Sequence, residues 1–325
     1  MLNNIRNIIN TPSKQTSSAD LGPYCNLPQL MKLRLSVKHL CLPKAKAVSR
    51  PQTGQHMSRF KGRGMEFSEV RVYQPGDDVR SIDWRVTARR QTPHTKIFEE
   101  ERERPLLVVC DQSQSQFFGS QHTFKSVRAA EVAALFSWTA LEHNDRVGGI
   151  VFSERGHREV KPARNRKSIM KLLSFINDFN QNLSILPPTK EQNFSFNDAM
   201  NETIRLAKPG TMIVIISDFL HLSPDTEKQF SKLSKHNELI MIRTYDPIEE
   251  DLPPPGFYPV SDGTETIVIN SQSSQSRKNY QAWANEHKEK LKSFSRKFKA
   301  TYFELSTHED TTQALQRVLI NLKAS

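Results

Sequence analysis

The feature that most constrains the fold is an alternation of apolar runs and helical patterns that begins at Pro105. Four runs have the length of buried strands: PLLVVC at 105–110, RVGGIVFS at 146–153, TMIVIIS at 211–217 and ELIMIRTY at 238–245. Stretches in which apolar residues recur at helical spacing separate them. This alternation predicts an α/β fold, a doubly wound, mostly parallel sheet with helices on both faces.

Weaker patterns fill the rest of this region. Helices are expected at about 122–143, 166–179 and 197–207. Two shorter strand candidates are TETIVIN at 264–270 and ATYFELS at 300–306. The stretch DPIEEDLPPPGFYPVSDG, 246–263, predicts a Pro-rich loop at one edge of the sheet, and 277–299 predicts a basic amphipathic helix.

The chain divides into three expected parts: a flexible leader over 1–26, an appended N-terminal segment over 27–104 and the α/β domain over 105–325. Leu30, Leu33, Val37 and Leu40 recur at helical spacing, which predicts an amphipathic helix over 27–42. A basic stretch follows at 44–64.

Several classes of protein are disfavoured by composition. No apolar run approaches the roughly 20 residues needed to cross a bilayer, and the first residues do not resemble a secretory signal, so a cytoplasmic protein is expected. Three scattered cysteines without a CxxC pair disfavour a structural zinc or a disulfide framework. The net charge of +11 favours anionic partners but does not choose between nucleic acid, acidic protein and a membrane surface.

The candidate site lies where two of the apolar runs end. PLLVVC is followed by DQSQS, Asp111 to Ser115, and TMIVIIS is followed by Asp218. Ligands of open parallel sheets bind beyond the carboxyl ends of the strands, so the two carboxylates are expected at one rim. Asp111, Ser113 and Ser115 offer only oxygen atoms, which suits a hard cation such as Mg²⁺. The alternative is that these residues cap the following helix.

A third ligand loop is expected within TKEQNFSFND at 189–198. It offers Thr189, Ser195 and Asp198 just before a helix. Ser195 is a candidate ligand, but Ser195 or Asp198 could equally be the N-cap of that helix.

The segment GRGMEFSEVRVYQPGDDVRSIDWRVTARR, 62–90, precedes the sheet and interleaves acidic and basic side chains. We expect an ion-pair network that pins the segment to the main domain, with Trp84 as its anchor. A binding surface is the alternative.

With DQSQS, this segment resembles the bacterial family called domain of unknown function 58. Members of that family resemble von Willebrand factor type A domains, and their genes commonly lie beside a MoxR-type AAA+ ATPase. In von Willebrand type A domains an Asp-x-Ser-x-Ser loop, a Thr and an Asp form a metal-ion-dependent adhesion site. The resemblance therefore implies that Asp111, Ser113, Ser115 and Asp218 are metal ligands. The Thr does not carry over: either Ser195 substitutes for it or Phe194 occupies its position.

Three functions are compatible with these features. The first is a non-enzymatic protein-interaction module that uses a divalent cation, Mg²⁺ by preference, to capture a carboxylate of a protein partner and works with a MoxR-type ATPase. The second is a metal-dependent phosphoester hydrolase with Asp111 as nucleophile, which the absence of an Asp-x-Asp motif disfavours. The third is binding of nucleic acid or an acidic surface, including peripheral membrane contact, by the basic stretches. Nucleic acid is disfavoured because aromatic residues are sparse there.

Overall fold

In a computed structural model, residues 22–40, 42, 65–100, 104–121, 123–184, 193–261 and 266–324 are described. Six strands form one sheet in the order β10-β7-β6-β3-β4-β5. Their bounds are Leu106–Asp111 for β3, Val147–Ser153 for β4, Gly156–Ala163 for β5, Met212–Ser217 for β6, Glu238–Tyr245 for β7 and Thr301–Ser306 for β10. All neighbours pair in parallel except β4 and β5, which confirms the predicted mostly parallel sheet.

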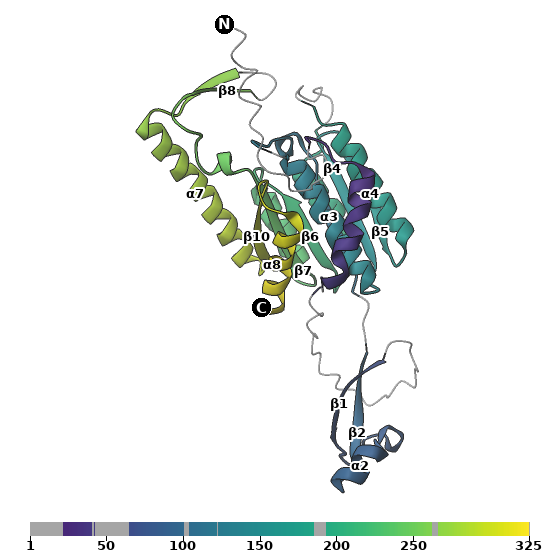
Figure 1. Cartoon of the computed structure of the whole chain (residues 1–325). Helices are drawn as coiled ribbons and strands as arrows, with labels where there is room; N and C mark the ends of the chain where they lie inside the picture. The colour runs from purple at the N-terminus through teal and green to yellow at the C-terminus, as the bar shows by residue number, and fades with distance from the viewer. Residues whose placement is uncertain are drawn as a thin grey trace, which may run out of the picture.

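Helices cover both faces of this sheet (Figure 1). One face packs against α3 (Lys125–Glu142), α4 (Arg166–Gln181) and α8 (Thr311–Ala324). The other packs against α5 (Phe196–Leu206), α6 (Pro224–Ser234) and α7 (Ser274–Lys297). Alternate residues of β3 enter the two cores, Val108 on the first face and Val109 on the second, because successive strand side chains point to opposite faces. The doubly wound arrangement is therefore confirmed.

The predicted helix over 27–42 is present in two pieces, α1 (Leu27–Lys32) and the 3-10 helix η1 (Leu33–His39). Leu30, Val37 and Leu40 are buried in the core that α3 and α4 line, and Leu33 is partly buried there. Trp138 of α3 donates a hydrogen bond to the carbonyl oxygen of Leu30 at 3.0 Å. Just before α1, the backbone N–H of Cys25 donates to Asn180 of α4 at 2.8 Å. The basic stretch at 44–64 lies outside the described residues.

Residues 65–100 form a hairpin that lies apart from the main sheet (Figure 1). Strands β1 (Met65–Val72) and β2 (His94–Glu100) pair antiparallel, with η2 (Val79–Ser81) and α2 (Trp84–Arg90) between them. The ion pairs between described residues here, Arg71–Asp77 and Lys96–Asp83, stay within the hairpin. The prediction of a network that pins this segment to the main domain is therefore wrong for these residues.

The anchoring role expected for Trp84 is also wrong, because 67% of this residue is exposed. Trp84 is the first residue of α2, and the cap of that helix is Asp83, whose side chain accepts from the backbone N–H groups of Arg85 and Val86. In the part of the chain that the structure describes, this short helix contacts β2 of its own hairpin and no apolar core covers the indole.

A second hairpin, β8 (Phe257–Ser261) and β9 (Thr266–Asn270), stands outside the main sheet. The loop predicted over 246–263 therefore ends at 256, since β8 follows it. The strand predicted from TETIVIN exists as β9, but it pairs only with β8. No helix in the described parts of the chain is long and apolar enough to span a bilayer.

The exposure of Trp84 can be tested against a buried tryptophan. Trp84→Ala should change the free energy of unfolding by less than about 0.5 kcal/mol, as for other surface substitutions. Trp138 is 1% exposed, so Trp138→Ala should cost roughly 3–5 kcal/mol. Urea denaturation of both variants measures the difference. Similar losses for the two variants would show that Trp84 is packed in solution.

Candidate functional site

The two strand-end carboxylates come together because β3 and β6 are neighbours in the sheet. Asp111 is the last residue of β3, and Asp218 directly follows β6. Each is 4% exposed. The Ser217 hydroxyl donates to Oδ2 of Asp111 at 2.6 Å and so joins the two strand ends directly. The carboxyl ends of β3 and β6 therefore form one polar rim.

The DQSQS loop continues this cluster. Oδ1 of Asp111 accepts from the backbone N–H of Ser113 at 2.9 Å, a bond that turns the chain at the end of β3. The hydroxyl oxygens of Ser113 and Ser115 lie 3.1 Å apart. The Ser115 hydroxyl also helps to lower the pKa of Asp218. We call Asp111, Ser113, Ser115 and Asp218 the oxygen cluster.

The helix-cap interpretation of DQSQS finds no support in this geometry. The N-cap residue of α3 is Phe124, and it makes no side-chain capping bond. Ser113 precedes a single 3-10 turn, η3 (Gln114–Gln116), and its side chain does not cap that turn either. The Ser113 and Ser115 hydroxyls contact each other instead. Gln112 bonds to Ser126 and Asn180, and Gln114 donates to the carbonyl oxygen of Ser184.

A lysine that sequence reasoning missed lies at this rim. Lys125, the first residue of α3, is 1% exposed. Its Nζ lies 3.1 Å from Oδ2 of Asp218 and 2.6 Å from Oε1 of Glu249. Glu249 belongs to η4 (Pro247–Glu249), which follows β7. The available sequence signal was a lysine at a helix N-terminus, where the helix dipole disfavours a cation and some compensation is needed.

Burial and charge act differently on the two aspartates. Burial, with the nearby Asp218 charge, raises the pKa of Asp111 from 3.8 to about 7. Burial alone would also raise the pKa of Asp218, but the Lys125 ammonium and the Ser115 hydroxyl hold it below its ordinary value. The cluster thus contains one carboxylate with a cationic partner and one whose ionised form is poorly compensated.

Ser195 has a local role. It is the N-cap of α5 and forms a capping box with Asp198: its hydroxyl lies 2.7 Å from Oδ2 of Asp198, and its backbone N–H donates to the same oxygen at 2.9 Å. Among described residues, no contact joins Ser195 to the oxygen cluster. Thr189, from the same predicted loop, lies outside the described residues.

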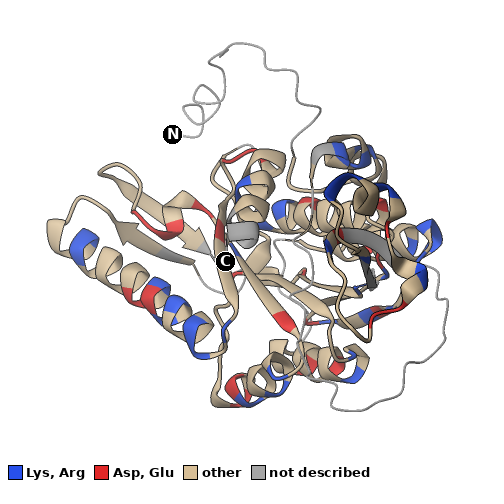
Figure 2. Cartoon of the chain, turned by 90° about the horizontal axis from the view of Figure 1, so that it is seen from below, with Lys and Arg blue, Asp and Glu red and all other residues tan. Residues whose placement is uncertain are grey.

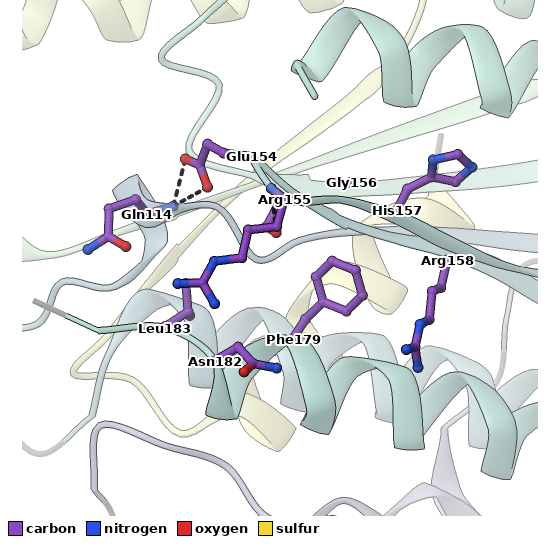
Figure 3. A pocket seen from close by; sticks show the side chains of 10 residues that line it. Gln114, Glu154, Arg155, Gly156, His157, Arg158, Phe179, Asn182 and Leu183 are labelled. Atoms are coloured by element: carbon purple, nitrogen blue, oxygen red, sulfur yellow. Dashed lines mark hydrogen bonds between the residues drawn. The ribbon is translucent and has the colours of Figure 1, made fainter. Parts of the chain in front are cut away.

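A pocket with a volume of about 280 Å³ opens beside the DQSQS loop (Figure 3). Glu154 accepts the backbone N–H of Gln114 at 2.8 Å, so the turn after β4 is bound to the loop. The Arg155 guanidinium points into the pocket towards Asn182, at the end of α4, and Phe179 forms part of the opposite wall (Figure 3). Arg155 forms no ion pair with any described residue. The pocket therefore offers a free cation next to the oxygen cluster.

A second group with metal-binding residue types is His157, Glu159 and Glu202, on β5 and α5. Arg205 pairs with Glu202 at 2.6 Å and also with Glu159. Because both carboxylates already have a cationic partner, this group is a weaker candidate than the oxygen cluster.

Comparison with known proteins places the chain in a family. The model of a family described as "Protein of unknown function DUF58" matches residues 69–290. The chain belongs to the DUF58 family. An uncharacterized protein of Mycobacterium tuberculosis is 29% identical over 216 residues, which are 66% of this chain and 66% of that protein. The same values hold for an uncharacterized protein of Mycobacterium bovis. The match thus spans just under two thirds of these relatives.

Solved structures with similarity to the chain share little sequence with it. BatB, a conserved hypothetical protein from Bacteroides thetaiotaomicron, is 15% identical, covers 68% of this chain and 98% of its own, and has a TM-score of 0.39. A von Willebrand factor type A protein from Catenulispora acidiphila is 11% identical, covers 71% and 44%, and has a TM-score of 0.34. A mussel byssus matrix protein with a zinc-occupied MIDAS motif is 10% identical, covers 68% and 48%, and has a TM-score of 0.36.

The DUF58 match includes the DQSQS loop and most of the 62–90 segment. It begins at Glu69 in the β1–β2 hairpin and extends past the oxygen cluster, Lys125 and Glu249. The family resemblance expected from the sequence is therefore confirmed. The link to a MoxR-type ATPase stays a prediction.

The raised pKa of Asp111 predicts how stability depends on pH. Between about pH 4 and about pH 7 the folded protein holds a proton that the unfolded chain has released, so stability should fall as pH rises through this window. Asp111→Asn removes this slope and, in EDTA at neutral pH, should stabilise the fold by roughly 1–4 kcal/mol.

Urea denaturation at several pH values in EDTA measures this effect. Asp225→Asn is the control, because Asp225 is exposed on α6 and its pKa is lowered by Lys228 rather than raised. An unchanged slope in Asp111→Asn would contradict the assignment.

Proposed function

We propose that this DUF58 protein is a non-enzymatic protein-interaction module whose rim holds a divalent cation and captures a carboxylate of a partner protein. The observation that supports this most is the oxygen cluster itself, in which two buried carboxylates and two hydroxyls lie together at the carboxyl ends of β3 and β6. A site of this kind binds ligands in open α/β sheets.

The residues present fit a hard divalent cation, with Mg²⁺ as our first choice. Asp111, Ser113, Ser115 and Asp218 present only oxygen donors, which Mg²⁺ prefers. A cation would also compensate the ionised form of Asp111.

Hydrolysis with Asp111 as nucleophile is the weaker hypothesis. Both Asp111 oxygens already accept hydrogen bonds, one from the Ser113 N–H and one from the Ser217 hydroxyl. In addition, Ser113 stands where the second aspartate of an Asp-x-Asp hydrolase would be, so no acid–base partner follows Asp111. The arrangement therefore favours binding over catalysis.

The partner that we propose is acidic at the contact. Its carboxylate would complete the coordination of the cation, and a second acidic side chain would fit the neighbouring pocket, where Arg155 has no ion-pair partner among the described residues. A MoxR-type AAA+ ATPase is the partner that the family resemblance implies. Together the two proteins would assemble or remodel another complex.

A pull-down with the MoxR-type ATPase of the same organism tests this proposal. Retention in Mg²⁺ should fall at least about tenfold in EDTA and in Asp111→Ala, since a charged hydrogen-bonded contact is worth more than 1.4 kcal/mol. Calorimetry should show that Asp111→Ala abolishes Mg²⁺ binding. Retention that is unaffected by both EDTA and Asp111→Ala would refute the cation-dependent mechanism.

Two arginines of the pocket test whether an acidic side chain of the partner binds there, one as the variant and one as its control. Arg155→Glu should weaken retention of the partner without changing Mg²⁺ affinity. Arg158→Glu is the control, because Arg158 pairs with Asp178 at 3.3 Å and lies over the Phe175 ring. Equal losses in the two variants would argue against a specific contact at Arg155.

The β1–β2 hairpin supports a second candidate function, docking onto an acidic protein surface. Four arginines there are exposed and form no ion pair with another described residue: Arg80, Arg85, Arg89 and Arg90. They flank the exposed Trp84, and exposed tryptophan with arginine is typical of interface hot spots. The hairpin is therefore a better candidate for this role than the basic helix predicted at 277–299.

That helix, α7, is present, but much of its basic charge is compensated. Figure 2 shows basic and acidic segments alternating along it. Lys288 pairs with Glu250 and Glu304, and Lys297 pairs with Glu227. Lys290 and Lys292 pair within the helix with Glu286 and Glu289. Internal pairing lowers the affinity of such a surface for external anions.

Binding to poly-glutamate, measured at low and moderate salt, compares the two surfaces. Arg85→Glu with Arg89→Glu should reduce binding at least about tenfold, because free charges dominate association with a polyanion. Lys290→Glu with Lys292→Glu on α7 should have a smaller effect. A larger loss from the α7 variant, or stronger binding of single-stranded RNA than of poly-glutamate, would overturn this candidate.

A further inference from the structure

Lys125 is held at the rim by two carboxylates that come from separate elements. Asp218 follows β6, Glu249 follows β7, and Lys125 itself begins α3. Glu249 is fixed in turn, because its Oε2 accepts the backbone N–H of Asp246 at 3.0 Å in a capping box. A lysine buried to 1% exposure with two carboxylates on its Nζ is a built feature and not a surface side chain that happens to fold inwards.

The lysine and the cation of the proposed function would use the same carboxylate. The ammonium group contacts Oδ2 of Asp218. Oδ1 of Asp218 accepts the backbone N–H of Leu220 at 3.3 Å. Asp218 therefore already has a cationic partner on one oxygen and a backbone donor on the other.

We propose that Lys125 is a built-in cation of the rim, which competes with the divalent cation for Asp218 and thereby sets the affinity of the site. This inference rests on the proposed function, since it concerns the regulation of the same site. Without a divalent cation, Lys125 bridges Asp218 and Glu249 and holds the end of β6 to the end of β7. When a cation binds, Lys125 gives up Asp218 and keeps Glu249, which lies closer, at 2.6 Å.

The charges make the direction of the effect clear. Two positive charges that share one buried carboxylate repel each other strongly, because the interior screens them much less than water does. Removing the lysine charge should therefore strengthen cation binding. Removing the Glu249 charge should weaken it, because Lys125 then has only Asp218 as a partner.

Titration of the full chain with Mn²⁺, followed by calorimetry and by electron paramagnetic resonance of the free ion, tests both directions. Lys125→Met should bind Mn²⁺ at least about tenfold more tightly than the wild type, given the size of such charge interactions. Glu249→Gln should bind it several-fold more weakly. Lys125→Arg keeps the charge and should not show the gain. Glu250→Gln is a neighbouring control, since Glu250 pairs with Arg243 and Lys288 instead.

Melting temperatures in EDTA and in Mn²⁺ provide a second readout. Lys125→Met should melt below the wild type in EDTA, because Asp218 and Glu249 lose their shared partner, and Mn²⁺ should raise its melting temperature more than that of the wild type. If Lys125→Met does not fold, the opposite shift in Glu249→Gln carries the test.

The outcomes separate this inference from the proposed function. Binding by Lys125→Met but not by the wild type supports the built-in cation and removes the divalent cation from the wild-type function. Binding by both proteins with equal affinity, or weaker binding by Lys125→Met, overturns the inference and leaves the proposed function standing. If neither protein binds Mn²⁺, both the competition and the metal part of the proposed function fail.

Discussion

The parallel pairing of β3 with β6 is the constraint on which the rest of the site depends. Its register sets Cys110 opposite Ile216, so Asp111 comes next to Ser217 and Asp218 at the ends of the two strands. Both strands are fully buried, and a slip of one residue would exchange the side chains of the two cores. The apolar residues that make the strands central in the sheet therefore also determine where the carboxylates lie.

Burying two carboxylates at the carboxyl ends of neighbouring strands costs free energy of folding unless other groups compensate their charge. The structure meets this cost through the Ser217 hydroxyl, the turn of the DQSQS loop and Lys125. The compensation is incomplete at Asp111, whose pKa is raised to about 7. A buried carboxylate with incomplete compensation is common at binding sites. A ligand that supplies positive charge gains affinity because it stabilises the ionised form of that carboxylate.

Patterns in the sequence predicted the buried elements well and the exposed ones poorly. Runs such as TMIVIIS predicted β6, because a strand covered on both faces must be apolar throughout. The edge strand β5 was missed, since GHREVKPA is mostly half-exposed and has only Val160 buried. The role predicted for the hairpin around Trp84, an ion-pair network with the main domain, was wrong. A pattern of charges along the sequence does not show which residues will form ion pairs, and here they pair within the hairpin.

The sequence by itself determined the doubly wound sheet and the two aspartates that follow its central strands, because hydrophobic periodicity and strand ends are local properties. The division of the chain at 26 and 104, and the metal ligands themselves, stay predictions. Only the tertiary structure placed Lys125 beside Glu249, which lies 124 residues away in the chain. It also showed that Ser195 caps α5 in a capping box. Contacts between the ends of different strands depend on strand order, and strand order is a property of the whole sheet that no local pattern encodes.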